Sequence, residues 1–507
     1  AIGHTAIGSG VMTGDDNTAI GRIAGHDLTS GTFNNFIGYF AGANATTATN
    51  TIAIGREAIS TGVLTGTDNT AIGQEAGNDL TSGTYNFFGG YRAGSNATTG
   101  DNNVGIGRYA IGVGVLTGSD NTAIGYGAGQ DLTSGSRNNF MGFQAGYNIT
   151  TGTGNIISGY QAGEFATTAN YGIAIGYSAI GLGVMTGSDN TAIGRSAGQD
   201  LTSGNYNNFI GYNAGGNATT LDYSIAIGYS AMGTGVVTGT DNIAIGRLAG
   251  QDLTSGTYNN FMGYQAGANV TTGISNVFQG YNAGANVTTA DAAIAIGRYA
   301  IGVGVMTGDD NTALGRAAGQ DLTSGAYNNF MGSYAGQNAT TADSTVAIGR
   351  EAIGLGVLTG DHNVAIGRLA GNDLTSGAYN NFMGYQAGYN ATTASYTVAI
   401  GSQAIGLGVL TGGSNVAIGR LAGNDLTSGA SNVLMGHNAG ANVTTGADNT
   451  ILGPSAGDAL TTGSNNTIIG HDAAASSATV SNQITLGNAS IATIRAQVTS
   501  ITALSDR

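Results

Sequence analysis

Residues 69–83 read Asn-Thr-Ala-Ile-Gly-Gln-Glu-Ala-Gly-Asn-Asp-Leu-Thr-Ser-Gly, a short apolar run closed by glycine and followed by turn-forming residues. Variants of this stretch recur along the chain. When the glycine that ends each apolar run is taken as position 0, these anchor glycines run from Gly3 to Gly487, always 17 or 18 residues apart. Self-similarity at a fixed short period predicts a repeat architecture in which each repeat stacks on the next.

The 29 anchor glycines define 29 coils over residues 1–487, and the coils are of three kinds. Type A continues into a Gly-Val-x-Thr-Gly stretch and takes 18 residues, whereas type B (Asp-Leu-Thr-Ser-Gly) and type C (Asn-x-Thr-Thr) take 17 each. One A-B-C set forms a superperiod of 52 residues that repeats eight times, with an additional C-like coil at Gly159 and another at Gly280. Because each insertion is a whole coil, the register is expected to continue through it.

The residues of a coil favour β-structure over helix. The apolar runs are four or five residues long, β-branched or aromatic, and bounded by Gly, Asn, Asp, Ser and Thr. The 91 glycines disfavour helix, since each costs up to ~1 kcal/mol in a helix interior. We therefore predict an all-β chain, a parallel β-solenoid (β-roll or β-helix) whose 17–18-residue coils each hold two or three short strands. Residues 488–507 depart from the repeat and are predicted to form a separate β segment.

Composition excludes several classes of function. The 507 residues carry a net charge of −15, which disfavours binding to nucleic acid or to an acidic membrane surface. No apolar run approaches the ~18–20 residues that span a bilayer, so we expect no membrane insertion. The chain has no cysteine, which is compatible with an extracellular location. Because it begins inside a coil, at Ala1, we expect further sequence before it.

Three positions of the coil recur strongly enough to predict their surroundings. Position +3 is Ala in 28 of the 29 coils, and position −1 is Ile, Leu or Met in 26, which predicts a buried ladder of −1 side chains. Position +1 is Arg in ten coils and Tyr in ten others. Unpaired buried arginines would be prohibitively costly. Either the anchor glycine bends the chain outward or the arginines are paired at a subunit interface.

The bend is the preferred interpretation of the +1 position, and it predicts a surface ladder in which Arg stacks on Tyr. The residues assigned to this ladder are Arg22, Tyr39, Arg56, Tyr91, Arg108, Tyr160, Arg195, Tyr212, Arg247 and Tyr264. Position −2 is Ala in 15 coils and Phe in eight, and a narrow Gly/Ala roll has little room for Phe inside. The phenylalanines are therefore interpreted as a seam against a neighbouring chain, made of Phe36, Phe88, Phe140, Phe209, Phe261, Phe330 and Phe382.

No catalytic, metal or cofactor site is predicted, and we do not expect an enzyme. The five histidines fall at unrelated coil positions, and Glu57, Glu75, Glu164 and Glu351 are too dispersed in sequence for a paired acid and base. The Asp of each B coil is interpreted as a turn residue rather than a Ca²⁺ ligand. The same preference for turn chemistry over glycosylation applies to the C-coil sequons at Asn44, Asn96, Asn148, Asn217, Asn269, Asn286, Asn338, Asn390 and Asn442.

Ser224–Gly228 (Ser-Ile-Ala-Ile-Gly), Thr345–Gly349 (Thr-Val-Ala-Ile-Gly) and Asn363–Gly367 (Asn-Val-Ala-Ile-Gly) resemble the head repeats of trimeric autotransporter adhesins. The resemblance covers about residues 1–487. It implies a left-handed parallel β-roll assembled as a homotrimer. The coils here are longer than the usual repeat of that family.

Residues 481–488, Ser-Asn-Gln-Ile-Thr-Leu-Gly-Asn, followed by Ser505-Asp506-Arg507, resemble the junction that precedes an intramolecular chaperone domain in phage tail fibres and tailspikes. In that family the chaperone drives trimerisation and then cleaves itself off at the Ser of a Ser-Asp-Arg-Arg-x-Lys stretch. Only the first three positions of that stretch are present. The resemblance implies that residues 488–507 close the end of a trimer.

Together these resemblances imply a homotrimeric phage tail fibre shaft in the virion tail, outside the cell, which holds a receptor-binding tip and contacts a host surface glycan or receptor. The alternative is the head of a bacterial cell-surface trimeric adhesin or another extracellular filament. An ice-binding solenoid would need a flat Thr array on every coil, whereas the Thr pairs here occur mainly in C coils. The +1 ladder is interpreted as structural rather than as a sugar-stacking surface.

Overall fold

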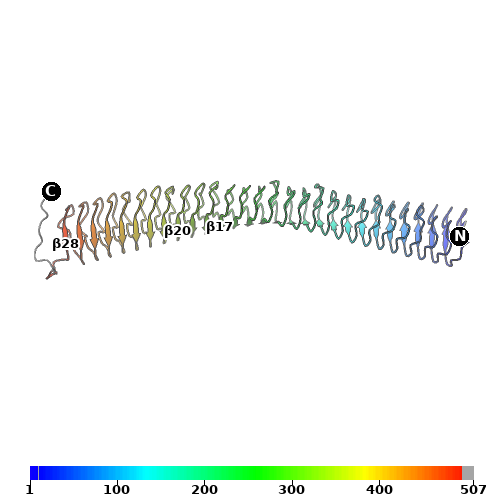
Figure 1. Ribbon diagram of the computed structural model, residues 1–507, viewed down its shortest axis with the longest axis horizontal. Helices are drawn as coiled ribbons and strands as arrows, with labels where there is room; N and C mark the ends of the chain where they lie inside the picture. Colours follow the sequence, from blue (N-terminus) through cyan, green and yellow to red (C-terminus); the bar gives the residue numbers. More distant parts are fainter. Residues whose placement is uncertain (9–10, 494–507) are drawn as a thin grey trace. The chain divides into compact units, whose positions relative to one another are not determined.

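The computed structural model describes residues 1–8 and 11–493. These residues form an all-β parallel β-solenoid of about 28 coils of ~17 residues, as predicted (Figure 1). They contain no helix, and therefore none long and apolar enough to cross a membrane. The chain divides into two compact units, Ala1–Asn282 and the part that begins at Ala283.

Every described strand is three residues long and occupies positions −3 to −1 of its coil. The strands of the first unit are β1 (Thr18–Ile20), β2 (Asn35–Ile37), β3 (Ile52–Ile54), β4 (Thr70–Ile72), β5 (Phe87–Gly89), β6 (Val104–Ile106), β7 (Thr122–Ile124), β8 (Asn139–Met141), β9 (Ile156–Ser158), β10 (Ile173–Ile175), β11 (Thr191–Ile193), β12 (Asn208–Ile210), β13 (Ile225–Ile227), β14 (Ile243–Ile245), β15 (Asn260–Met262) and β16 (Val277–Gln279). Those of the second unit are β17 (Ile294–Ile296), β18 (Thr312–Leu314), β19 (Asn329–Met331), β20 (Val346–Ile348), β21 (Val364–Ile366), β22 (Asn381–Met383), β23 (Val398–Ile400), β24 (Val416–Ile418), β25 (Val433–Met435), β26 (Thr450–Leu452), β27 (Thr467–Ile469) and β28 (Ile484–Leu486).

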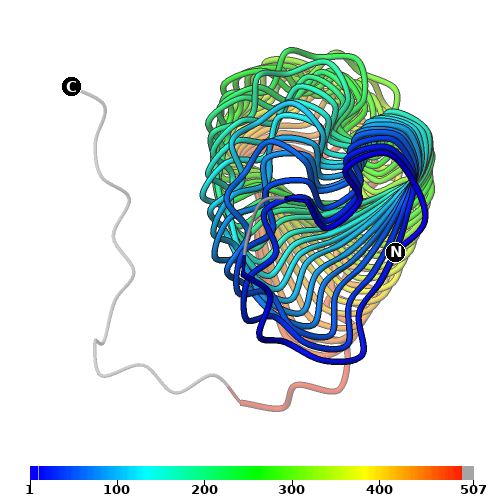
Figure 2. The same cartoon turned by 90° about the vertical axis from the view of Figure 1, so that its right-hand side faces the viewer.

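Within each unit, every strand pairs in parallel with the strand of the next coil. Equivalent positions lie opposite one another, so that Ala19 faces Phe36 and Ile20 faces Ile37. The same register holds through the inserted coil at β9, where Ile157 pairs with both Phe140 and Ala174. The first anchor, Gly3, belongs to a coil that contributes only the isolated bridge of Ile2 to Ile20. Figure 2 looks along the stack, where successive coils of the first unit, from blue to green, follow similar outlines.

Each coil holds one strand, not the two or three that were predicted. The remainder of the coil is a succession of turns, because left-handed residues interrupt it: in the coil of β1, Gly21 has φ +135°, Ile23 +62° and Gly25 +59°. Alternation of left- and right-handed residues cannot extend as a strand. The backbone still bonds from coil to coil, as where the N–H of Phe40 donates to the Arg22 carbonyl at 3.0 Å.

The side chains at position −1 point outward, so the predicted buried −1 ladder is wrong. In β1, Ala19 at −2 is 1% exposed, whereas Ile20 at −1 is 39% exposed. Period-2 alternation in a three-residue strand places only its central residue inside. The interior is completed by Ala24 at +3 and, in the B coils, by a leucine such as Leu28, both fully buried.

The phenylalanines at −2 lie inside their own chain, so their interpretation as an interchain seam is also wrong. Phe36, Phe88, Phe140, Phe209, Phe261, Phe330 and Phe382 are each at most 1% exposed. Glycines at +4 make room for each ring. A Cβ on Gly25 would lie 2.9 Å from the Phe36 ring, and one on Gly42 would lie 2.6 Å from it. In type A coils the distribution is reversed, with Ala53 at −2 and a buried Ile59 at +4.

A column of buried asparagines at position −4 joins the coils. Asn138 illustrates it, because its backbone N–H and its Nδ2 each donate to Asn121 Oδ1 at 3.0 Å. Its Nδ2 also donates to the Gly152 carbonyl at 2.8 Å, and its own Oδ1 accepts from the N–H of Asn155 at 3.0 Å. Turn chemistry was predicted for such residues. Their burial in a continuous ladder was not.

We expect Asn138→Ala to lower the free energy of unfolding by about 1–3 kcal/mol, because it leaves the Asn155 N–H and the Gly152 carbonyl buried without these partners. Asn138→Thr is the matched control, since Thr occupies this column at Thr51, Thr345 and Thr397. Urea unfolding followed by circular dichroism measures both variants. Equal stability of Asn138→Ala and the parent chain would contradict a stabilising ladder.

Candidate functional site

The +1 side chains form an exposed edge along the coils, which we call the +1 edge. The anchor glycines from Gly3 to Gly470 have φ between +128° and +140°, and this turns the chain outward after the strand. Arg56 is 61% and Arg350 65% exposed in their side chains. The arginines of the described coils are thus on the surface, which agrees with a bend at the anchor glycine.

Within the first unit, much of the +1 edge is a stack of rings and guanidinium groups. Tyr126, Phe143, Tyr160 and Tyr177 stack in sequence with ring centroids 5.1, 4.9 and 5.1 Å apart. Arg195 follows, with its Cζ 5.5 Å from the Tyr177 ring and 5.7 Å from the Tyr212 ring. Each exposed cation–π contact contributes about 0.5–1 kcal/mol, so the edge also stabilises the stacking of coils.

The structure brings most of the ten predicted ladder residues into such contacts. Arg22 lies over Tyr39 at 5.8 Å and Arg108 over Tyr91 at 5.5 Å, while Arg247 lies over Tyr264 at 5.6 Å. Tyr160, Arg195 and Tyr212 belong to the stack described above. Arg56 instead pairs with Glu57, its Nε lying 3.2 Å from Glu57 Oε1.

No protein-family model matches this sequence, and no curated protein is similar to it. The surface is therefore interpreted from its own geometry.

A polar groove beside the +1 edge contains residues that sequence reasoning dismissed. Glu57 and Glu75 are 18 residues apart, which is one coil, so both lie at position +2 of adjacent coils, where the Glu75 N–H donates to the Arg56 carbonyl at 2.9 Å. The 18-residue spacing was the available signal. The groove has a volume of about 440 Å³ and is lined by Tyr39, Phe40, Asn44, Glu57, Ser60, Thr61, Glu75 and Asn78.

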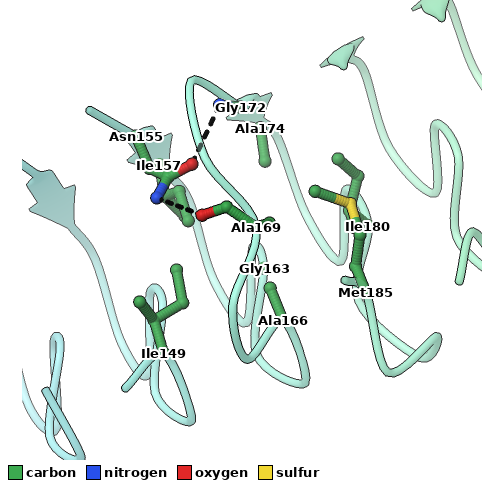
Figure 3. Close-up of a pocket in the computed structure, with 10 residues that line it drawn as sticks. All are labelled: Ile149, Asn155, Ile157, Gly163, Ala166, Ala169, Gly172, Ala174, Ile180 and Met185. Carbon is green, nitrogen blue, oxygen red and sulfur yellow. Dashed lines mark hydrogen bonds between the residues drawn. The ribbon is translucent and has the colours of Figure 1, made fainter. Parts of the chain in front are cut away.

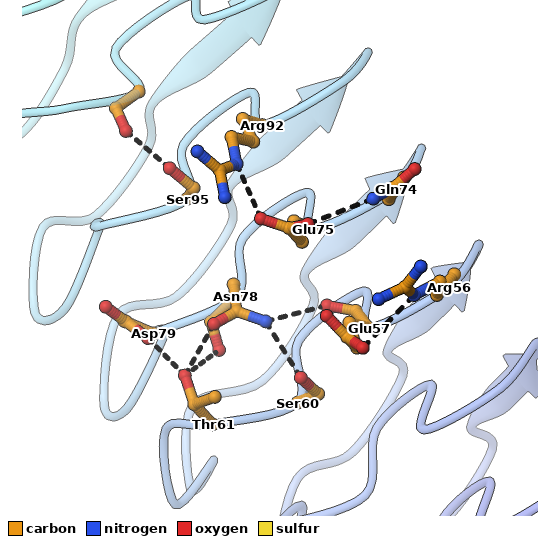
Figure 4. A network of polar contacts seen from close by, with 11 residues as sticks. Arg56, Glu57, Ser60, Thr61, Gln74, Glu75, Asn78, Asp79, Arg92 and Ser95 are labelled. Carbon is orange, nitrogen blue, oxygen red and sulfur yellow. Dashed lines mark hydrogen bonds and ion pairs between the residues drawn. The ribbon is translucent and has the colours of Figure 1, made fainter.

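Hydrogen bonds hold the groove from several coils (Figure 4). Asn78 Nδ2 donates to Ser60 Oγ at 2.8 Å, and Thr61 Oγ1 donates to Asn78 Oδ1 at 2.6 Å. Arg92 Nε lies 2.5 Å from Glu75 Oε2. A second pocket of about 310 Å³ lies beside it and shares Glu75 and Asn78. The combination of aromatic rings with amide, hydroxyl and carboxylate groups suits a polyhydroxylated ligand such as a glycan.

The groove carboxylate is not tuned as a general acid. Burial raises the pKa of Glu75, but hydrogen bonds from Gln74 and Arg92 outweigh it, so that its pKa lies below the ordinary value. A general acid that operates near neutral pH needs a raised pKa. The arrangement is suited to binding.

The interior offers little space for a ligand. Figure 3 shows a cavity at the inserted coil of β9, where Ile157 replaces the phenylalanine of other C-like coils. Its volume is about 10 Å³, the lower limit for one water molecule. Asn155 borders it and donates from Nδ2 to the Ala169 carbonyl at 2.8 Å.

The two other periodic features serve contacts between coils. Asp252 Oδ1 accepts a hydrogen bond from Thr234 Oγ1 of the preceding coil at 2.5 Å. In the described residues no three His, Asp or Glu side chains gather as metal ligands. Among the sequons, Nδ2 of Asn44 donates to the Thr61 carbonyl at 3.0 Å, and Nδ2 of Asn217 to the Thr234 carbonyl at 2.9 Å.

Burial raises the pKa of four B-coil aspartates, Asp131, Asp200, Asp321 and Asp373. The folded state therefore binds these protons more tightly than the unfolded chain does. Their contribution to stability accordingly falls as the pH rises from the unfolded-state pKa through the raised folded-state pKa.

The predicted C-terminal segment 488–507 lies mostly outside the described residues. Residues 488–493 contain a turn and no strand, and Ser505, Asp506 and Arg507 are not among the described residues.

Proposed function

We propose that this chain is a structural and adhesive fibre rather than an enzyme. The observation that carries the proposal is the unbroken coil register within each unit, which repeats the same outward-facing positions in coil after coil. Such a chain gains length and surface repeats by adding coils. The +1 edge and the groove of Glu57 and Glu75 supply the adhesive surface, with a host glycan or receptor as partner.

The preferred assignment is the shaft of a phage tail fibre, acting in host attachment from the virion tail. The support is the resemblance of residues 481–488 and 505–507 to a chaperone-domain junction. The alternative is a bacterial adhesin head or extracellular filament. The sequence encoded after residue 507 distinguishes them, since a self-cleaving chaperone domain supports the fibre, and a coiled-coil stalk with a membrane anchor supports the adhesin.

Removal of one superperiod tests the structural role. Deletion of residues 191–242 joins Asn190 to Ile243 and preserves the coil register. We expect a folded protein whose first unit is shorter by three coils, about 14 Å, as measured by small-angle X-ray scattering. The control deletes residues 191–232, which breaks register and should lower the unfolding temperature. Equal behaviour of the two deletions would contradict a modular shaft.

The fibre is further proposed to be a homotrimer that buries the outward face of its sheet. In the first unit this face carries a row of −1 side chains, each 36–48% exposed: Ile20, Ile72, Ile106, Met141, Ile175, Ile193, Ile210 and Ile245. A row of this extent exceeds the few hundred Å² at which an exposed apolar patch indicates an interaction surface. Another copy of the chain has the same coil period, so its row matches this one along its length.

Sedimentation equilibrium tests this assembly, with a mass of three times 50.1 kDa expected. The triple variant Ile193→Gln, Ile210→Gln and Ile245→Gln should dissociate at a concentration at least tenfold higher, because it makes the row polar. Gln279 already occupies this position in β16, so the fold tolerates the change. A monomeric parent chain would overturn the trimer and leave the solenoid intact.

A further inference from the structure

Position −5 forms a second exposed column, on the other side of the strand from the +1 edge. Its residues are left-handed, as in Tyr171, Asp189 and Tyr206, with φ 52°, 58° and 58°. Coil-to-coil hydrogen bonds keep the column in register. The Asp189 N–H donates to the Asn170 carbonyl at 2.9 Å, and the Tyr206 N–H donates to the Ser188 carbonyl at 3.2 Å.

Two sets of three coils in the first unit place an aspartate between two tyrosines in this column. They are Tyr171–Asp189–Tyr206 and Tyr223–Asp241–Tyr258. The four tyrosines are 51–63% exposed. Tyr206 and Tyr223 stack on each other, with ring centroids 5.0 Å apart and planes within 7°. Their opposite faces are therefore turned toward the coils of Asp189 and Asp241.

The +1 edge of these same coils shows what such a gap accepts. Arg195, on the coil of Asp189, lies between Tyr177 and Tyr212, its Cζ 5.5 and 5.7 Å from the two rings. On the coil of Asp241, Arg247 lies between Tyr229 and Tyr264, at 5.7 and 5.6 Å. Two tyrosines separated by two coils, about 9.6 Å, thus hold one planar guanidinium group.

The −5 column repeats this spacing of tyrosines, but its middle residue is an acid instead of an arginine. Among the described contacts, no hydrogen bond or ion pair engages the exposed Asp189 carboxylate. Asp241 Oδ2 accepts one hydrogen bond, from Thr240 Oγ1 at 2.8 Å. Each set of three residues is therefore a slot with aromatic walls and a carboxylate at its floor.

We propose that these two slots bind arginine side chains of a partner protein. The guanidinium group stacks between the tyrosines as Arg195 does on the +1 edge, and the aspartate receives its hydrogen bonds. The net charge of −15 favours a cationic partner. Arginine suits the slot better than lysine because a planar group fills the gap between two rings, and an ammonium group does not.

The spacing of the slots specifies how a partner presents its arginines. Asp189 and Asp241 are 52 residues apart, which is three coils, or about 14 Å. An extended peptide places residues i and i+4 on the same side and about 13–14 Å apart. A strand that carries arginines at i and i+4 therefore reaches both slots. This inference is independent of the proposed fibre function.

The test is calorimetric titration of the full chain with acetyl-Arg-Ser-Gly-Ser-Arg-amide at 50 and 150 mM NaCl. We expect binding at least tenfold tighter than that of the same peptide with lysines. The double variant Asp189→Asn and Asp241→Asn should weaken binding at least tenfold, and so should Tyr206→Ser with Tyr223→Ser. Serine is tolerated, since Ser275 and Ser414 occupy this column with φ 61° and 60°.

Asp120→Asn is the matched control, because Asp120 occupies the same column position between Asn102 and Arg137 and has no tyrosine beside it. This variant should bind the arginine peptide as the parent chain does. Equal affinity for the lysine peptide, or an equal loss in Asp120→Asn, would overturn the slots and leave only general attraction to an acidic chain. Circular dichroism of each variant checks that it is folded.

Discussion

Gly211→Ala is expected to separate the stacked coils on either side of it. Gly211 has φ +132°, a backbone region that side chains rarely adopt. A Cβ here would lie 2.6 Å from the carbonyl oxygen of Gly228 in the next coil, and neither backbone can move away without breaking the bond from the Gly228 N–H to the Ile210 carbonyl. We expect a local loss of about 3 kcal/mol or more.

Hydrogen exchange measures this loss coil by coil, since the stability of a solenoid is a sum of local terms. Amide protection around residues 208–230 should fall roughly a hundredfold, while distant coils are unchanged. Gly216→Ala is the control in the same coil. The equivalent position is alanine at Ala43 and Ala268, and the new Cβ would meet only the movable Asn213 side chain. Similar losses in both variants would contradict the argument from close approach.

Phe330→Ala is expected to lower the free energy of unfolding of the second unit by about 3–5 kcal/mol. The Phe330 ring is 1% exposed. It packs against the bare Cα atoms of Gly319 and Gly336, where a Cβ would lie 2.8 and 2.6 Å from it. Glycines carry no side chain that could move into the space, so the cavity stays open. Urea unfolding, followed by circular dichroism, gives the change.

Two controls distinguish a core phenylalanine from a surface one. Phe330→Leu should cost much less than Phe330→Ala, because Leu434 occupies the equivalent position beside Gly423 and Gly440. Tyr327→Ala, in the same coil but 62% exposed, should change stability by less than about 1 kcal/mol. If Phe330→Ala altered only the mass in solution and not the stability, the interchain interpretation of the phenylalanines would regain support.

The errors in the sequence interpretation have one physical origin. Strict alternation requires a strand of several residues, but each strand here ends at an anchor glycine after three. The direction of Ile20 and of Arg22 therefore depended on the φ of Gly21, which no periodicity reveals. Similarly, Phe36 fits inside because Gly25 and Gly42 lie against its ring from different coils, a fact of packing and not of composition.

The separation of Glu57 and Glu75 illustrates the complementary case. Eighteen residues seem distant in sequence, yet the period makes them neighbours on adjacent coils. The same conversion brings Arg195 between Tyr177 and Tyr212 and places Asp189 between Tyr171 and Tyr206. The period, applied to every polar residue, is sufficient to group these side chains by column and by adjacent coil.

The sequence alone determined the coil, its 17–18-residue period, the whole-coil insertions and the parallel register, because in a solenoid every long-range contact joins equivalent positions one period apart. Only the tertiary structure decided which columns face inward, how many strands a coil contains and which side chains complete the +1 edge, the groove and the two slots. Those features follow from backbone angles at glycine and from the sizes of side chains on neighbouring coils. Both are set by how the coils close on one another.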